Sequence, residues 1–397
     1  MVVLGAWCAM MSSMGLLNTL AVLQAWVSEH QLRDMPESAV GWIFSTYSFF
    51  LYFCGAQIGP IFDANDIRLL LVPGSVGMVA AVMCMSFSTE FWHLLLSFGI
   101  LGGISASLLF YPSVSAISHW FYRRRSLATG LSFTAGGLGG VIYPLVILYL
   151  APVIGFPWSI RIIGFISVVT TALACCLLRK RLPPNNVTGG SINLKALSNP
   201  KYTIVTVAVF LVEFAVFIPY TYISSYAISK GMNSQAAYRL NTLLNAGAIP
   251  GRVLPGYFAD RFGIFNVMII TAIICTALIF GLWLPINDNE TGIIAFTMAF
   301  GFWSGAAISL TPVCIGKVCR TTDYGTRAGT TFFIASFGAL TGVPIAGAIL
   351  PSGGYAGLII LAGASYGATV VALVWARSLI NSDREDRWFP WAFCQWL

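Results

Sequence analysis

The chain has 397 residues, of which 57% are hydrophobic and only 9% are charged. Soluble globular proteins carry about 25% charged residues, so this composition excludes a water-soluble fold and favours a membrane protein. The net charge of +7 does not indicate nucleic-acid binding, because membrane proteins collect basic residues on their inner loops.

Twelve apolar runs of helical length follow one another along the chain. In lipid every backbone polar group must be satisfied within its own segment, so we expect each run to form a transmembrane helix. The predicted spans are residues 3–25, 40–60, 69–88, 93–117, 127–150, 157–178, 203–228, 240–259, 264–285, 292–314, 328–350 and 354–376. The sequence therefore predicts an all-α membrane protein with 12 transmembrane helices.

Basic residues set the orientation of these helices. With both termini in the cytosol, sixteen Lys and Arg residues fall on the cytosolic side and four on the outer side, which is the usual bias of membrane proteins. The longest loop, residues 179–202, separates an N-terminal six-helix bundle (1–178) from a C-terminal one (203–380), and a cytosolic tail (381–397) follows.

The two predicted halves repeat short features. The segment 59–63 (Gly-Pro-Ile-Phe-Asp) follows the second run, and 256–260 (Gly-Tyr-Phe-Ala-Asp) follows the eighth, 197 positions later. Prolines recur 200 positions apart in two pairs: Pro112 with Pro312, and Pro144 with Pro344. Such a period predicts two bundles related by a pseudo-twofold axis, an architecture found in transporters.

Two charged residues, Glu213 and Arg252, fall deep inside apolar runs. An unpaired charge in hydrocarbon is costly, so we expect both to face an interior cavity or each other. Helical spacing places further polar residues on the same faces: Tyr220 and Ser224 with Glu213, and Asn241 and Asn245 with Arg252. A structural ion pair is one interpretation. The other is functional, with Arg252 holding a carboxylate and Glu213 carrying a proton.

Four stretches resemble the major facilitator superfamily and, within it, the fungal branch of the monocarboxylate-porter family. They are residues 120–130 continuing through Pro144, 13–20, 217–222 and 245–256. The likeness spans nearly the whole chain, although the family's acidic-Gly-Gly signature before the first helix is absent. The resemblance implies a secondary active transporter that moves a small organic anion or carboxylated metabolite across the plasma membrane by alternating access.

The resemblance also implies a substrate site, because Arg252 matches the family's substrate-contacting arginine in the eighth helix. The substrate-binding candidates are Arg252, Asn18, Asn245, Tyr220, Glu213 and Tyr143. Asn18 and Ala248 stand where the proton-coupled animal members have a lysine and an aspartate. Lactate–proton symport is therefore not implied. A co- or counter-transported proton stays open, and so does efflux of a fungal secondary metabolite.

The repeated glycine–aspartate turns predict a conformational latch on the cytosolic side. Glycine permits close helix approach, and aspartate can cap a helix or pair with an arginine. By resemblance, this motif stabilises the outward-facing state. The latch candidates are Gly59, Asp63, Arg68, Gly256, Asp260, Arg261, Arg124 and Arg125. The basic run 123–125 has two interpretations: the inner-loop bias alone, or a contact to Asp260 or Asp323.

The sequence lacks the patterns of an enzyme or a metal protein. The three histidines are scattered, most cysteines fall in apolar runs, and no phosphate-binding loop or nucleophile–base pattern occurs. We expect no catalysis, metal or cofactor, and a monomer in the lipid bilayer with a small-molecule substrate. A non-transporting nutrient sensor is the alternative from another class. Such sensors usually carry long cytosolic tails, which the predicted organisation does not include.

Overall fold

The computed structural model describes residues 1–183, 194–286 and 289–385. These residues form helices and short turns and contain no β-strand, which confirms the predicted all-α fold. The helices in the first part of the chain are α1 (Val2–Leu17), α2 (Leu20–Glu29), α3 (Glu37–Phe53), α4 (Gly55–Ala64), α5 (Arg68–Met85), α6 (Phe91–Leu94), η1 (Leu95–Gly102), α7 (Gly103–Trp120), α8 (Arg125–Ile154) and α9 (Phe156–Leu177). Those that follow are η3 (Leu194–Ser198), α10 (Pro200–Ser229), α11 (Ser234–Phe262), α12 (Ile264–Leu278), η4 (Ile279–Trp283), α13 (Glu290–Lys317), η5 (Thr321–Asp323) and α14 (Tyr324–Glu385).

Most of these helices are long and apolar enough to cross a bilayer. Within the described ranges nine helical segments meet that condition by length and composition, and α1 with α2, which meet at 42°, make a tenth. α11 is not among them, because it carries Asn241, Asn245 and Arg252 along one side. α14 consists of two helices joined at Gly354, whose φ of 60° interrupts the helix. Each of the twelve predicted runs overlaps at least one of these helices, and the last two runs both overlap α14.

Local sequence explains where several helices begin and end. Asn199, Asn233 and Asn289 precede α10, α11 and α13, and each side-chain oxygen accepts a hydrogen bond from a backbone N–H of the first turn. The chain turns sharply at Gly155 (φ 85°) between α8 and α9 and at Gly263 (φ 92°) between α11 and α12. Glycine adopts this left-handed backbone without steric cost.

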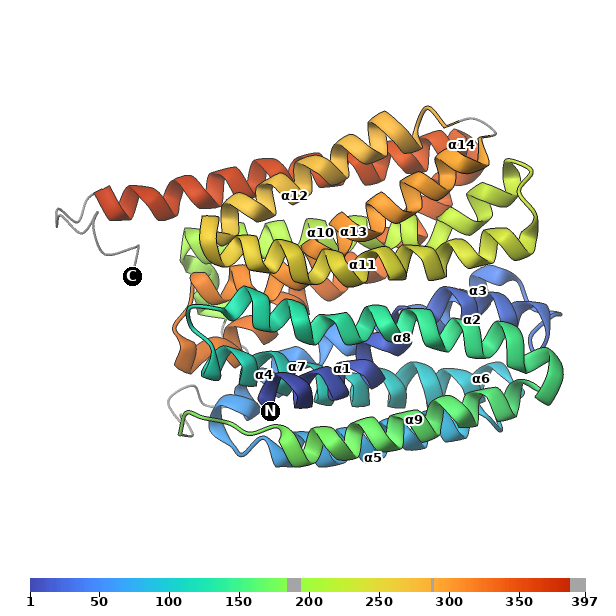
Figure 1. Ribbon diagram of the computed structural model, residues 1–397, viewed down its shortest axis with the longest axis horizontal. Helices are drawn as coiled ribbons and strands as arrows, with labels where there is room; N and C mark the ends of the chain where they lie inside the picture. Colours follow the sequence, from blue (N-terminus) through green and yellow to red (C-terminus); the bar gives the residue numbers. More distant parts are fainter. Residues whose placement is uncertain (184–193, 287–288, 386–397) are drawn as a thin grey trace.

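The helices up to α9 lie together as a first group, and those from α10 onward form a second group, with α8 and α11 in contact between them (Figure 1). Just after α9 the chain stays in contact with the first group, because the Trp120 indole donates to the carbonyl oxygen of Arg179 at 2.8 Å. We call the end of the helices that holds this contact the linker end. Parts of the predicted linker and tail, residues 184–193 and 386–397, lie outside the described residues.

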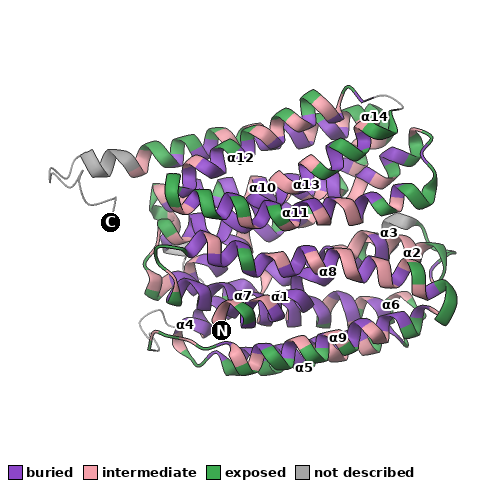
Figure 2. Cartoon of the chain, viewed as in Figure 1, coloured by how far each residue is buried: buried purple, intermediate pink, exposed green. Residues whose placement is uncertain are grey.

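The outward faces of the peripheral helices are apolar. Figure 2 shows exposed positions along the outer sides of α5, α9 and α12, whereas buried positions dominate the centre. The exposed side chains include Leu69 and Val76 on α5, Val169 on α9 and Ile270 on α12. A helical body with its large apolar side chains turned outward is suited to a lipid environment.

Close packing between α1 and α8 generates a prediction for stability. A Cβ atom at Gly139 would lie 2.5 Å from the Cα atom of Gly15, so the Gly139→Ala substitution should force the two helices apart. We expect it to cost about 1–3 kcal/mol and to lower the melting temperature of the detergent-solubilised protein. Gly281→Ala is the matched control, because a Cβ there would meet no heavy atom within 4 Å. Equal melting temperatures for the two variants would contradict this account.

Candidate functional site

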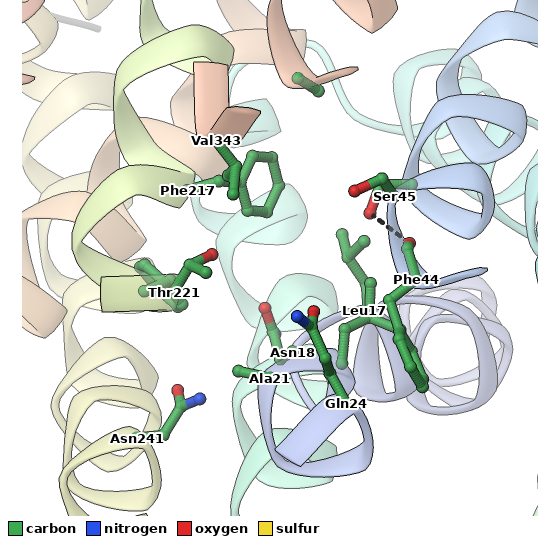
Figure 3. A pocket seen from close by; sticks show the side chains of 14 residues that line it. Leu17, Asn18, Ala21, Gln24, Phe44, Ser45, Phe217, Thr221, Asn241 and Val343 are labelled. Atoms are coloured by element: carbon green, nitrogen blue, oxygen red, sulfur yellow. Dashed lines mark hydrogen bonds between the residues drawn. The ribbon is translucent and has the colours of Figure 1, made fainter. Parts of the chain in front are cut away.

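A cavity of about 70 Å³ lies between the two groups of helices. Side chains from α1, α2 and α3 of the first group and from α10, α11 and α14 of the second line it (Figure 3). The polar lining residues are Asn18, Gln24, Ser45, Ser48, Tyr220, Thr221 and Asn241. None of the lining residues carries a full charge, so the cavity wall itself offers hydrogen bonds and apolar contact.

Asn18 reaches this cavity because α1 ends beside it. Asn18 and Thr19 are not helical, and the chain bends there by 42° into α2. In Figure 3, Thr221 and Asn241 face the space from one side, and Asn18 and Gln24 face it from the other. A break in a membrane-spanning helix brings polar groups to an interior site.

Arg252 lies next to this cavity and is fully buried. Its Nη1 donates a hydrogen bond to the carbonyl oxygen of Phe133 at 2.6 Å, which joins α11 to α8 of the other group. Nε and Nη2 have no hydrogen-bond partner among the described residues. The Tyr220 side chain, which lines the cavity, is a neighbour of the guanidinium. The Nε and Nη2 donors of Arg252 therefore remain available to a ligand, and Tyr220 of the cavity wall lies beside the guanidinium.

Asn18 and Asn245 meet across the boundary between the two groups. Asn18 Nδ2 donates to the carbonyl oxygen of Gly136 at 2.8 Å, and Asn245 Nδ2 donates to the carbonyl oxygen of Asn18 at 3.4 Å. A Cβ at Gly140 would lie 2.5 Å from Asn245 Cγ, so the glycine lets α11 approach α8. The structure thus brings these two candidates together with Arg252.

Glu213 and Tyr143 are not among the residues that line the cavity. Glu213 is buried on α10, and the described residues provide no hydrogen-bond partner for its Oε2. It forms no ion pair with Arg252 in the described structure, so the interpretation of the two as a structural ion pair is not supported. The Tyr143 hydroxyl donates to the carbonyl oxygen of Met11 at 3.3 Å, which is a packing contact between α8 and α1.

The two repeated aspartates make equivalent contacts at the linker end. Asp63 accepts hydrogen bonds from the backbone N–H groups of Gly325, at 3.2 Å, and Thr326, at 2.7 Å. Asp260 accepts from the backbone N–H groups of Ser126 and Leu127, both at 3.0 Å. Each carboxylate therefore caps the first turn of a helix in the other group, α14 or α8, where N–H groups lack helical partners.

The glycine of each turn permits these caps to form. A Cβ at Gly256 would lie 2.8 Å from the carbonyl oxygen of Ser126, and one at Gly59 would overlap the carbonyl oxygen of Gly325. Any other residue at either position would push apart the two helices that the aspartate joins. The repeated Gly–Asp spacing therefore serves two needs: the glycine lets two helices approach closely, and the aspartate caps one of them.

The arginines of the predicted latch do not bind these carboxylates. Arg125 Nη1 donates to the carbonyl oxygen of Gly316 at 3.2 Å, and its guanidinium lies 4.5 Å from the centre of the Tyr324 ring. Arg125 thus also joins the two groups, through a carbonyl and a ring. The remaining candidates, Arg68, Arg124 and Arg261, are exposed.

Sequence reasoning missed Lys180, which anchors the start of the linker. Its Nζ donates to the carbonyl oxygens of Phe62 and Asp63, each at 2.7 Å. Burial lowers the pKa of the Lys180 ammonium, and the nearby carboxylates of Asp63 and Asp66 oppose that effect. No spacing connects Lys180 to the turn at Asp63, because the contact spans more than a hundred positions. Gln24 was also missed, although a polar residue inside an apolar run is a detectable signal.

Removal of one cap should loosen the linker end. We expect Asp260→Ala to weaken the contact with α8 by about 0.5–2 kcal/mol, the usual cost of losing a helix cap. Spin labels at the exposed positions Tyr122 and Phe262 should then report a larger population of long distances. Asp34→Ala, at an exposed position between α2 and α3, is the control. A distance distribution that Asp260→Ala leaves unchanged would exclude a latch role.

Comparison with known proteins identifies the family. Residues 2–331 match the sequence profile of the Major Facilitator Superfamily. The chain is 34% identical to the riboflavin transporter MCH5 of Saccharomyces cerevisiae, over 88% of this chain and 71% of that protein. It is also 34% identical to the aspyridones efflux protein apdF of Emericella nidulans, with the same coverage of 88% and 71%.

A solved structure supports the same assignment of fold. The human organic anion transporter MFSD10 is similar with a TM-score of 0.74 and 13% identity, covering 94% of this chain and 97% of that one. The relatives in this comparison are transporters and not enzymes. The chain therefore belongs to the Major Facilitator Superfamily, and the protein is a multi-pass helical membrane transporter.

Proposed function

We propose that this protein is a secondary active carrier, of the monocarboxylate-porter type, for an organic metabolite that bears a carboxylate. The observation that carries the proposal is Arg252, a fully buried guanidinium with donors unpartnered among the described residues and with Tyr220 beside it. A buried arginine fork binds a carboxylate strongly because both partners are charged and water is excluded.

The proposed architecture has twelve spans in two six-helix bundles. Ten spans follow from length and composition when α1 and α2 are combined. α11 as the amphipathic eighth span and the division of α14 at Gly354 supply the other two. We place both termini in the cytosol, since the basic residues then concentrate on the cytosolic side. We further propose that the carrier is a monomer in the plasma membrane.

With that orientation the linker end is cytosolic, and the two aspartate caps hold it closed. The cavity of about 70 Å³ is much smaller than the roughly 300–1,000 Å³ typical of ligand pockets. A metabolite therefore reaches the cavity only after the bundles separate at one end, either at the outer end or, once the caps break, at the linker end. Alternating access of this kind moves one bundle against the other around a fixed site.

Efflux of a larger secondary metabolite is the second candidate function. Similarity to the aspyridones efflux protein apdF favours it, and so does the uncharged cavity wall with Asn18 at its broken helix. In yeast cells loaded with a fluorescent aromatic carboxylate, export predicts faster loss of the dye when the protein is expressed. Uptake predicts the opposite change.

Arg252→Met tests the carboxylate anchor. In proteoliposomes assayed with a panel of aliphatic and aromatic monocarboxylates, we expect transport efficiency to fall roughly 10- to 100-fold, because a hydrogen bond to a charged group contributes about 1.5–3 kcal/mol. Riboflavin serves as the uncharged comparison. Arg239→Met, at an exposed position of the same helix, should keep wild-type rates. Unchanged carboxylate transport by Arg252→Met would refute the proposal.

A further inference from the structure

We propose that the first group of helices holds a zwitterionic phospholipid in a surface groove, with the lipid phosphate bound by Arg161 and the lipid ammonium group beside Glu90. The groove lies at the end of the helices opposite the linker end, which we call the distal end. Its residues line no part of the candidate substrate cavity, so the inference does not depend on the carboxylate proposal.

The groove is open, largely apolar and large enough for a lipid chain. Its volume is about 500 Å³, within the roughly 300–1,000 Å³ of pockets that bind small molecules. It lies beside α6, at the distal end of the first group (Figure 1). Three exposed apolar side chains and three hydrogen-bonding ones contribute to its lining: Phe87, Leu96 and Leu101, and Ser88, His93 and Ser97.

The π-helix η1 shapes the groove. A Cβ atom at Gly99 would lie 3.0 Å from the carbonyl oxygen of Ile43 on α3, so this side of η1 packs closely on α3. Leu96 and Leu101 belong to the same π-helix and line the open groove. π-Helical turns are rare and often lie at functional sites. The local winding of η1 thus presents two leucines to the bilayer instead of the protein interior.

A fixed guanidinium stands at one rim of the groove. The Cζ atom of Arg161 lies 4.7 Å from the centre of the Phe87 ring, which lines the groove, and 4.8 Å from that of Trp158. Its Nε donates to Ser86 Oγ at 3.3 Å. No aspartate or glutamate of the described residues forms an ion pair with Arg161. A guanidinium held by two rings and without a carboxylate partner suits a phosphate group.

A carboxylate accompanies this cation at the distal end. The Glu90 side chain is 72% exposed, and its Oε2 lies 3.9 Å from Nε2 of the groove residue His93. An anionic lipid would gain from Arg161 but would be repelled by Glu90. A zwitterionic headgroup complements both charges, with its phosphate on Arg161 and its ammonium group beside Glu90. A sterol carries no charge for either residue, so the charges favour a zwitterionic phospholipid.

Exposed tryptophans place these charges at the level of the lipid headgroups. Trp92 on α6 and Trp158 on α9 are both largely exposed, and tryptophan is enriched where a membrane meets water. From α6 the chain continues through η1 toward the middle of the helical body. Leu96 and Leu101 therefore lie at the depth of the acyl chains, below the charged rim, in the order that a phospholipid requires.

Photo-crosslinking in lipid nanodiscs tests the site. A phosphatidylcholine with a diazirine in one acyl chain should label the peptide that contains Leu96 and Leu101 above all other peptides on the membrane-facing surface. Arg161→Gln should lower this labelling roughly tenfold, because charge-assisted hydrogen bonds to the phosphate are lost. Arg33→Gln, at an exposed position between α2 and α3, should leave it unchanged. Labelling spread evenly over the surface would refute the proposal.

A second variant tests the groove without touching the guanidinium. Leu96→Trp fills the groove from an exposed position, so the protein should keep its melting temperature and lose most of the labelling. Val76→Trp, on the exposed side of α5 and outside the groove lining, is the matched control and should label as the wild type does. Equal labelling of the two variants would overturn the proposal.

Competition with unlabelled lipids tests the chemistry of the headgroup. We expect phosphatidylcholine to suppress the labelling at a mole fraction about tenfold lower than phosphatidylglycerol or cholesterol requires. Glu90→Gln should remove the preference over phosphatidylglycerol. Equal competition by phosphatidylglycerol would indicate a simple anion site, and equal competition by cholesterol would indicate an apolar groove alone. Either result would contradict a site for a zwitterionic lipid.

Discussion

The structure depends on two carboxylates that each cap a helix of the opposite group. Asp63 binds the first backbone N–H groups of α14, and Asp260 binds those of α8. A helix N-terminus attracts a carboxylate because its N–H groups lack helical partners and its dipole is positive. These bonds are few and modest in energy, since both partners can be hydrated when the groups separate. They join the two groups at the linker end through bonds that water can replace.

Contact between the two groups at this end accompanies a meeting of their polar side chains in the interior. Arg252 reaches from α11 to the carbonyl oxygen of Phe133 on α8, and Asn245 meets Asn18 across the same boundary. The polar side chains of the cavity come from both groups for the same reason. A movement that breaks the caps would therefore also rearrange the candidate substrate site, as the proposed alternating access requires.

The two buried charges occupy different surroundings. Arg252 keeps one strong hydrogen bond and has donors unpartnered in the described structure, beside a cavity residue. Glu213 lies among tyrosines nearer the closed end. Had the two formed an ion pair, each would have neutralised the other and neither would be available for a ligand or a proton. Because they are separate, Glu213 does not occupy the donors of Arg252.

The sequence by itself determined the apolar helices, the repeated Gly–Asp turns and the burial of Glu213 and Arg252, because each follows from composition or spacing within one segment. It did not determine the partners. An aspartate beside arginines suggested ion pairs, yet Asp260 binds backbone amides of Ser126 and Leu127 while Arg68 and Arg124 are exposed. Only the tertiary structure places Lys180 on the turn at Asp63 and brings Gln24 into the cavity. These contacts join helices whose relative positions no local pattern encodes, since they arise when the whole set of helices packs together.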